Sequence, residues 1–196
     1  MMRRFFLVLL LALTGCAADM APVPDPTYAA LMQAGVPVMQ VGVEAAGTAT
    51  FARRETLRGG IATFLTPDGV AVIVQDGMLR GTRGLGADML ASDIAASREL
   101  VLSMRSGRVE RLHSFLDGED RAAMRRYVCD IAVQGPRAIG LGTLQIDTVL
   151  LTEDCAGSEE EFVNYYWVLP AARRVVQSRQ WGGAFSGMIV MRDVAP

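Results

Sequence analysis

Six acidic residues lie in or beside segments with strand-like patterning, and they could supply the paired carboxylates of a glycosidase or lyase: Asp88, Asp93, Asp130, Asp147, Glu153 and Asp154. A glycosidase holds two carboxyl groups about 5 Å or about 6.5–9.5 Å apart across a cleft. Spacing along the chain does not show that any two of these residues converge. A polysaccharide-modifying enzyme is therefore one alternative for this protein, and we assign no catalytic residue.

Other catalytic and cofactor motifs are weak. The chain has one histidine, His113, which excludes a metal centre built from several histidines, and it has no G-x-S-x-G motif for a serine hydrolase. Residues 81–86 read G-T-R-G-L-G, which is not the order of the dinucleotide-binding motif. We expect a turn there, fixed by pairing of Arg83 with Asp88, and we expect neither a cofactor nor a metal.

Aromatic residues cluster near the end of the chain. Tyr165, Tyr166 and Trp167 are consecutive, and Trp181 follows. Alternation along a strand places Tyr165 and Trp167 on one face and Tyr166 on the other. One set should pack in the core, and the other could stack on sugar rings or on a partner.

The N-terminus resembles a bacterial lipoprotein signal. Arg3 and Arg4 precede an apolar run of about nine residues, which is too short to span a bilayer. The run ends in Leu13-Thr14-Gly15-Cys16, which resembles a lipobox. We therefore expect residues 1–15 to be a signal peptide and Cys16 to carry fatty acyl chains such as palmitate. Ala17 in place of Asp favours the outer membrane, facing the periplasm.

The other two cysteines are Cys129 and Cys155, and both lie in or beside strand-like runs. Disulfides form and persist in the periplasm. We expect a structural disulfide between them, the alternative being two separate buried thiols.

Period-two patterns dominate the chain after a proline-containing tether at 16–27. For example, 108–116 places Val109, Arg111, His113 and Phe115 on one face. Turn signals separate roughly ten strands, among them Pro67-Asp68-Gly69 and Asp76-Gly77. Gly135-Pro136 should break the chain, and Glu159–Glu161 should lie in a solvated loop.

Helices are few in this pattern. A short helix is expected over 28–34 and another within 88–104, with Met89, Leu90 and Ile94 on one face and Ser92 as its cap. The sequence thus predicts one mostly antiparallel, all-β domain over 28–196 with one or two short helices. Its sheets could form a sandwich or a partly open barrel.

Composition limits the classes of partner. The 196 residues are 51% hydrophobic and 20% charged, with a formal net charge of −2. This charge lacks the basic surplus of a nucleic-acid-binding protein, and the apolar fraction is too high for a disordered chain.

An ordered set of motifs resembles one family. These motifs are T-R-G-L-G-A-D at 82–88, Cys129, T-E-D-C at 152–155, N-Y-Y-W-V at 164–168 and S-R-Q at 178–180. The set is similar to outer-membrane lipoproteins of the YjbF/GfcB type, which are encoded with capsule and exopolysaccharide secretion genes. The resemblance implies a β-rich fold with coiled antiparallel sheets and a role in polysaccharide production or export, without implying a catalytic mechanism.

We therefore expect a non-catalytic lipoprotein that works with polysaccharide-export proteins and possesses a surface for a glycan or a partner. The candidate residues for that surface are Arg83, Asp88, Asn164, Tyr165, Trp167 and Gln180. A periplasmic carrier of lipids or other hydrophobic ligands is a further alternative, because a coiled sheet can enclose an apolar cavity.

Overall fold

The computed structural model describes residues 30, 33, 35–116, 121–141 and 144–194. Cys16, the signal peptide, the tether and most of the helix expected over 28–34 lie outside these residues. Among the residues that are described, no helix is long and apolar enough to cross a membrane.

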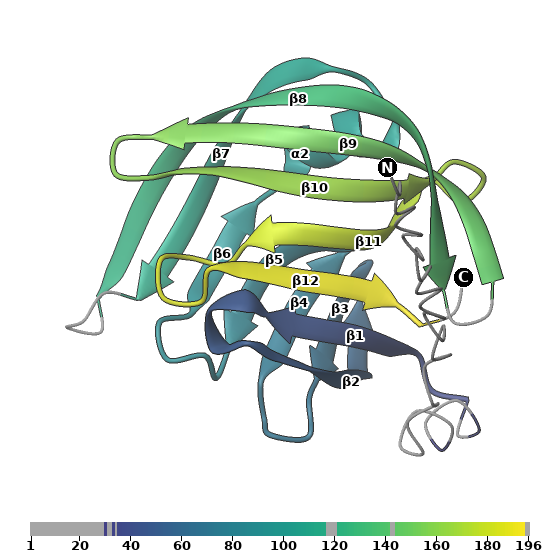
Figure 1. The fold of residues 1–196 in the computed structure, drawn as a ribbon. Helices are drawn as coiled ribbons and strands as arrows, with labels where there is room; N and C mark the ends of the chain where they lie inside the picture. The colour runs from purple at the N-terminus through teal and green to yellow at the C-terminus, as the bar shows by residue number, and fades with distance from the viewer. Residues whose placement is uncertain (1–29, 31–32, 34, 117–120, 142–143, 195–196) are drawn as a thin grey trace, which may run out of the picture.

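Twelve antiparallel strands form one sheet in the order β5-β4-β3-β2-β1-β12-β11-β10-β9-β8-β7-β6. The strands are β1 (Val38–Val43), β2 (Thr48–Arg58), β3 (Ile61–Leu65), β4 (Ala71–Gln75), β5 (Met78–Arg83), β6 (Met89–Asp93), β7 (Gly107–Leu116), β8 (Ala122–Leu141), β9 (Leu144–Gly157), β10 (Glu161–Leu169), β11 (Arg174–Trp181) and β12 (Met188–Asp193). The predicted antiparallel all-β class is confirmed. The sheet curls into a nearly closed barrel with β3–β5 behind β11 and β12 (Figure 1), so barrel rather than sandwich describes it.

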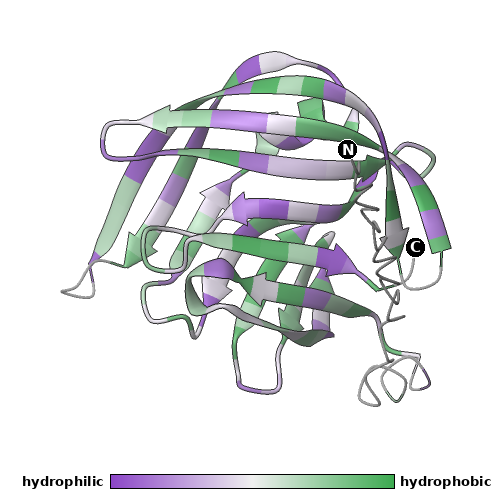
Figure 2. Ribbon diagram, in the orientation of Figure 1, coloured by the Kyte–Doolittle hydropathy of each residue, from purple (hydrophilic) through white to green (hydrophobic). Residues whose placement is uncertain are grey.

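The alternation of residue types follows the two faces of this barrel (Figure 2). Along β10, Phe162, Asn164, Tyr166 and Val168 are buried, and the residues between them are more exposed. The interior is filled by three contiguous groups of buried side chains. The strand pattern thus separates an inner face from an outer one.

Two helical segments complete the domain: the 3-10 turn η1 (Glu44–Ala46) and the helix α2 (Ala95–Leu102). Ile94, Val101 and Leu102 pack into the interior core with Tyr166 and Val168 of β10. Helix α2 therefore covers one end of the barrel.

The helix predicted within 88–104 is only partly correct. Residues 89–93 form strand β6, in which Met89 and Ser92 are both buried; a register shift between Met89 and Ala91 lets these residues of opposite parity share the inner face. The helix begins after them, and Asp93 rather than Ser92 accepts a hydrogen bond from a backbone N–H of its first turn, that of Ala95, at 3.0 Å.

The chain break predicted at Gly135-Pro136 is wrong. Strand β8 runs through both residues, with a register shift between Val133 and Gly135. A bulge tolerates proline, because the local ladder does not need its missing N–H group. The turn at Asp76-Gly77 is confirmed, and both residues have positive φ (51° and 80°), as a type I′ turn requires.

Candidate functional site

The glycine-rich segment 81–88 closes the barrel at the seam between β5 and β6. Gly81 allows a close approach, because a Cβ there would lie 3.0 Å from the carbonyl oxygen of Met89. The hydroxyl of Thr82 accepts a hydrogen bond from the Met89 N–H at 3.0 Å. Arg83 donates to the carbonyl oxygens of Met89 at 3.1 Å and Leu90 at 3.3 Å. Side chains therefore fasten the two edge strands together.

Asp88 orders the loop at this seam. Its carboxylate accepts hydrogen bonds from the Thr82 hydroxyl at 2.8 Å, the Gly84 N–H at 2.8 Å and the Leu85 N–H at 3.2 Å. The expected pairing of Arg83 with Asp88 is wrong, because each binds other groups. The glycine-rich segment therefore has a structural role: its hydrogen bonds order the loop and link β5 to β6.

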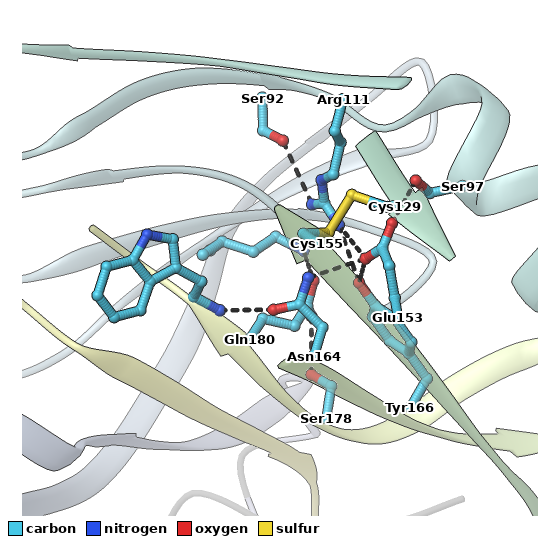
Figure 3. A network of polar contacts seen from close by, with 12 residues as sticks. Ser92, Ser97, Arg111, Cys129, Glu153, Cys155, Asn164, Tyr166, Ser178 and Gln180 are labelled. Carbon is cyan, nitrogen blue, oxygen red and sulfur yellow. Dashed lines mark hydrogen bonds and ion pairs between the residues drawn. A yellow bond between two sulfur atoms is a disulfide. The ribbon is translucent and has the colours of Figure 1, made fainter. Parts of the chain in front are cut away.

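A buried ion pair lies inside the barrel, within a network of polar contacts (Figure 3). Arg111 of β7 contacts Glu153 of β9, and their side chains are 2% and 0% exposed. Burial by itself would raise the pKa of Glu153, but the charge of Arg111 and hydrogen bonds from its neighbours hold that pKa below its usual range. Burial opposes and the Glu153 charge favours the cationic form of Arg111, whose pKa is raised overall.

Hydrogen bonds surround this ion pair on several sides. The carboxylate of Glu153 accepts hydrogen bonds from Ser97 of α2 at 2.5 Å, Asn164 at 2.8 Å and the Tyr166 hydroxyl at 2.6 Å. Arg111 donates to Tyr166 at 3.0 Å and to Ser92 at 3.3 Å. The two buried charges are therefore paired with each other, as burial demands, and the Arg111 Nε is left without a hydrogen-bond partner among the described residues.

The predicted disulfide between Cys129 and Cys155 is confirmed. The two residues face each other directly across β8 and β9. Their sulfur atoms and a carboxylate oxygen of Glu153 lie within 4.8 Å of one another, a grouping that could suit a metal if the thiols were free. The sulfurs are bonded to each other, so they offer no thiolate ligands.

Gln180 connects opposite walls of the barrel. Its side chain accepts a hydrogen bond from the Leu79 N–H of β5 at 2.9 Å and donates to the carbonyl oxygen of Gly77 at 3.1 Å. Asn164 of β10 accepts a hydrogen bond from the Trp181 N–H of the neighbouring strand β11 at 2.7 Å. These amides stabilise the packing of the barrel around its core.

His113 lies in an aromatic cluster near the other end of the barrel. It is 1% exposed, stacks on Phe162 with ring centroids 5.8 Å apart, and lies 4.9 Å from the ring of Tyr127. Burial, reinforced by the charges of Arg111 and Arg125, lowers its pKa to about 2. His113 is therefore a neutral core residue, and neither ring nitrogen forms a hydrogen bond with any residue that the structure describes.

The acidic run at 159–161 is not merely solvated. Arg125 forms ion pairs with Glu159 at 3.1 Å and with Glu160 at 3.0 Å. Glu160 also accepts a hydrogen bond from the Tyr127 hydroxyl. These contacts attach the β9–β10 connection to the start of β8.

The candidate surface residues divide between the two faces. Asp88, Asn164 and Gln180 are 8%, 1% and 1% exposed, so they act inside the protein rather than on a surface. Tyr165 and Trp167 lie on the outer face of β10, where their rings stack with centroids 6.4 Å apart. The aromatic alternation read from the sequence therefore agrees with the structure.

Sequence reasoning missed the role of Arg111. Its place on one face with His113 and Phe115 was visible, and a cation on such a face indicates a buried counter-charge. Nothing in the spacing of residues 111 and 153 identified Glu153 as that partner.

Comparison with known proteins agrees with this architecture. Residues 21–193 match a family described as "Group 4 capsule polysaccharide lipoprotein gfcB, YjbF". The chain belongs to this family. The resemblance drawn from the motifs is thus confirmed.

A solved structure shares the fold. It is the crystal structure of the hypothetical lipoprotein YmcC from Escherichia coli K12, with 16% sequence identity and a TM-score of 0.76. The similarity covers 86% of this chain and 88% of that one. No curated protein matches the sequence.

Proposed function

We propose that this protein is a non-catalytic lipoprotein of the outer membrane that faces the periplasm and assists the production or export of a capsule or exopolysaccharide. The family description supports the link to capsule polysaccharide. The lipobox ending at Cys16 and the following Ala17 support the anchor and its destination. Stable attachment through several acyl chains would hold the domain at the membrane surface.

The observation that carries the non-catalytic role is the enclosure of the polar network. Arg111 and Glu153 are the charged pair of this network, and both side chains are buried and form an ion pair with each other. A general acid needs a raised pKa and access to substrate. The network therefore fits a role in stabilising the barrel, and the outer surface is left to make the functional contacts.

The enzyme alternative has little support. In the described part of the chain, Asp193 is the carboxyl group with a raised pKa, to about 6, and burial is the cause. Its partner is Arg174 at 2.5 Å rather than a second carboxylate. The carrier alternative is also disfavoured, because core side chains fill the barrel interior.

Deletion of the gene, followed by complementation, tests the proposal. Loss of exported polymer is expected on deletion, with recovery from the wild-type gene. Cys16→Ala should release the protein into the soluble periplasmic fraction and should not restore export fully. Incubation of the purified protein with the isolated polymer should leave the polymer's chain length unchanged. Normal export after deletion, or shortening of the polymer, would refute the proposed role.

A further inference from the structure

A band of side chains crosses the outer face of four adjacent strands, β10, β11, β12 and β1. In one row, Tyr165 pairs with Arg179, Arg179 with Val190, and Val190 with Gly42. Residues directly opposite one another in an antiparallel sheet point to the same face. The four positions therefore form one line across the barrel wall.

A second row runs beside the first. Trp167 pairs with Gln177, Gln177 with Arg192, and Arg192 with Gln40. All four side chains are partly exposed. Neighbouring strands lie about 4.8 Å apart, so the rows span ~14 Å. This length suits a short stretch of a linear polymer lying across the strands.

The aromatic end of the band is held rigidly. The Arg179 guanidinium lies 5.9 Å from the centre of the Tyr165 ring, and Tyr165 stacks beside Trp167. Arg179 is itself fixed by two 2.6 Å hydrogen bonds to Glu44. A preorganised pair of rings offers a flat apolar surface at little cost in conformational entropy.

The other end of the band is hollowed. An open hollow of about 430 Å³ lies over β1, β2 and β12, and Gln40, Gly42, Glu44 and Arg192 are among its lining residues. The hollow exists at Gly42 because glycine has no side chain there. A Cβ at this position would meet only ordinary contacts, the nearest at 3.4 Å from the Thr48 carbonyl oxygen.

Arg192 gives this hollow its charge. Within the described residues its side chain forms no hydrogen bond or ion pair, and its Nε is buried without a partner. Glu44, the acidic group in the lining, is already neutralised by Arg179. A guanidinium is a planar fork that binds a carboxylate through two hydrogen bonds. The free cation therefore favours an anionic ligand.

We propose that this band binds a segment of an acidic polysaccharide, with a uronate carboxylate on Arg192 and sugar rings on Trp167 and Tyr165. The inference rests on the proposed function and names its substrate class. Two aromatic rings, the amides of Gln40 and Gln177, and one free guanidinium match the flat faces, hydroxyls and carboxylates of such a polymer. No residue of the two rows is fully buried.

The test is binding of hexagalacturonate to the full-length protein in detergent micelles, measured by tryptophan fluorescence and by calorimetry. The same hexamer with its carboxyl groups reduced to alcohols is the neutral probe. We expect tighter binding of the acidic hexamer and about a tenfold loss of that affinity in Arg192→Gln, as for a charge-assisted hydrogen bond. Arg192→Gln should leave the weaker binding of the neutral hexamer unchanged.

Two further variants separate the parts of the site. Trp167→Ala should weaken both hexamers, and Gly42→Val should weaken both by filling the hollow. Arg58→Gln is the matched control. It removes the same charge as Arg192→Gln, but Arg58 is exposed at the end of β2, away from the hollow. Thermal unfolding of each variant verifies that it is folded.

Equal affinity for the two hexamers, or no binding of either, would overturn the acidic-polysaccharide site. Equal losses in Arg58→Gln and Arg192→Gln would also overturn it, because attraction by net charge would then suffice. The proposed function is judged separately by polymer export after deletion. An exported polymer that needs the protein but not Arg192 would remove the site and leave the proposed function standing.

Discussion

Arg111 on β7 forms an ion pair with Glu153 on β9, although β8 lies between these two strands in the sheet. The pair therefore reaches over Cys129 of β8, and the Cys129–Cys155 disulfide lies beside it. On the inner face of the barrel, the disulfide thus joins the neighbouring strands β8 and β9, and the ion pair joins β7 to β9 across β8.

Glu153→Gln should destabilise the protein strongly. The substitution leaves Arg111 charged, buried and without a counter-charge, which costs about 3–5 kcal/mol for comparable buried pairs. Urea denaturation of the purified protein measures this loss. Asp130→Asn is the control, because its ion pair with Arg108 is exposed and solvent screens it, so little change is expected. Similar losses in both variants would contradict the importance of the buried pair.

Replacing Arg111 and Glu153 together should be much less harmful. Arg111→Met with Glu153→Leu removes both charges and leaves no ion uncompensated. The double variant should be more stable than Glu153→Gln, as judged by the same urea midpoints. A double variant as unstable as the single one would indicate that the hydrogen bonds around the pair, rather than its charges, hold the interior together.

Removing the disulfide should lower the free energy of unfolding by about 3.5 kcal/mol, as expected for a loop closed by cysteines 26 residues apart. Cys129→Ala with Cys155→Ala tests this by urea denaturation. A reducing agent should destabilise the wild type by a similar amount and leave the double variant unchanged. Sensitivity of the double variant to the reducing agent would contradict this assignment.

His113 should make stability depend on pH. Its pKa is about 2 in the folded protein and about 6.5 in an unfolded chain. At pH values between these two, the His113 ring therefore binds a proton in the unfolded state but not in the folded state. The contribution is fully present above pH 6.5 and is lost as the pH falls below it, by about 2 kcal/mol at pH 5. His113→Leu should lack this part of the acid sensitivity.

The measurement for His113 is the difference in unfolding free energy between the wild type and His113→Leu from pH 7.5 to pH 5. Because the chain has one histidine, its ring-proton NMR signal can also be followed directly. The signal should stay constant down to pH 4.5 in the folded protein. A titration near pH 6 would show that the ring is accessible to protons.

Gly77→Ala should be far more disruptive than Gly69→Ala. Both glycines have positive φ (80° and 88°), so alanine is strained at each by about 1–2 kcal/mol. At Gly77 the new Cβ would also lie 2.3 Å from the carbonyl oxygen of Val175, whereas Gly69 has open space. Overpacking should add about 1–3 kcal/mol. Melting temperatures compare the two variants, and equal shifts would contradict the close contact between the β4–β5 turn and β11.

Local patterns determined much of this protein. Period-two alternation identified most strands and placed Tyr166 on the opposite face from Tyr165 and Trp167, because side chains along a strand alternate whatever the rest of the chain does. Asp76-Gly77 specified its turn through backbone conformation alone. Two remaining cysteines left one pairing within the chain, and the structure contains it.

Only the tertiary structure decided which distant residues meet. Alternation places Arg111 on one face with His113 and Phe115, but it fixes neither which face is the inner one, nor the curvature of the sheet, nor the wall that each residue reaches. Curling of the sheet brings Gln180 to Leu79, 101 residues earlier, and aligns Arg192 with Trp167 on the outside. Such contacts depend on strand order and register, which are set by the packing of the whole barrel and leave no mark in the local sequence.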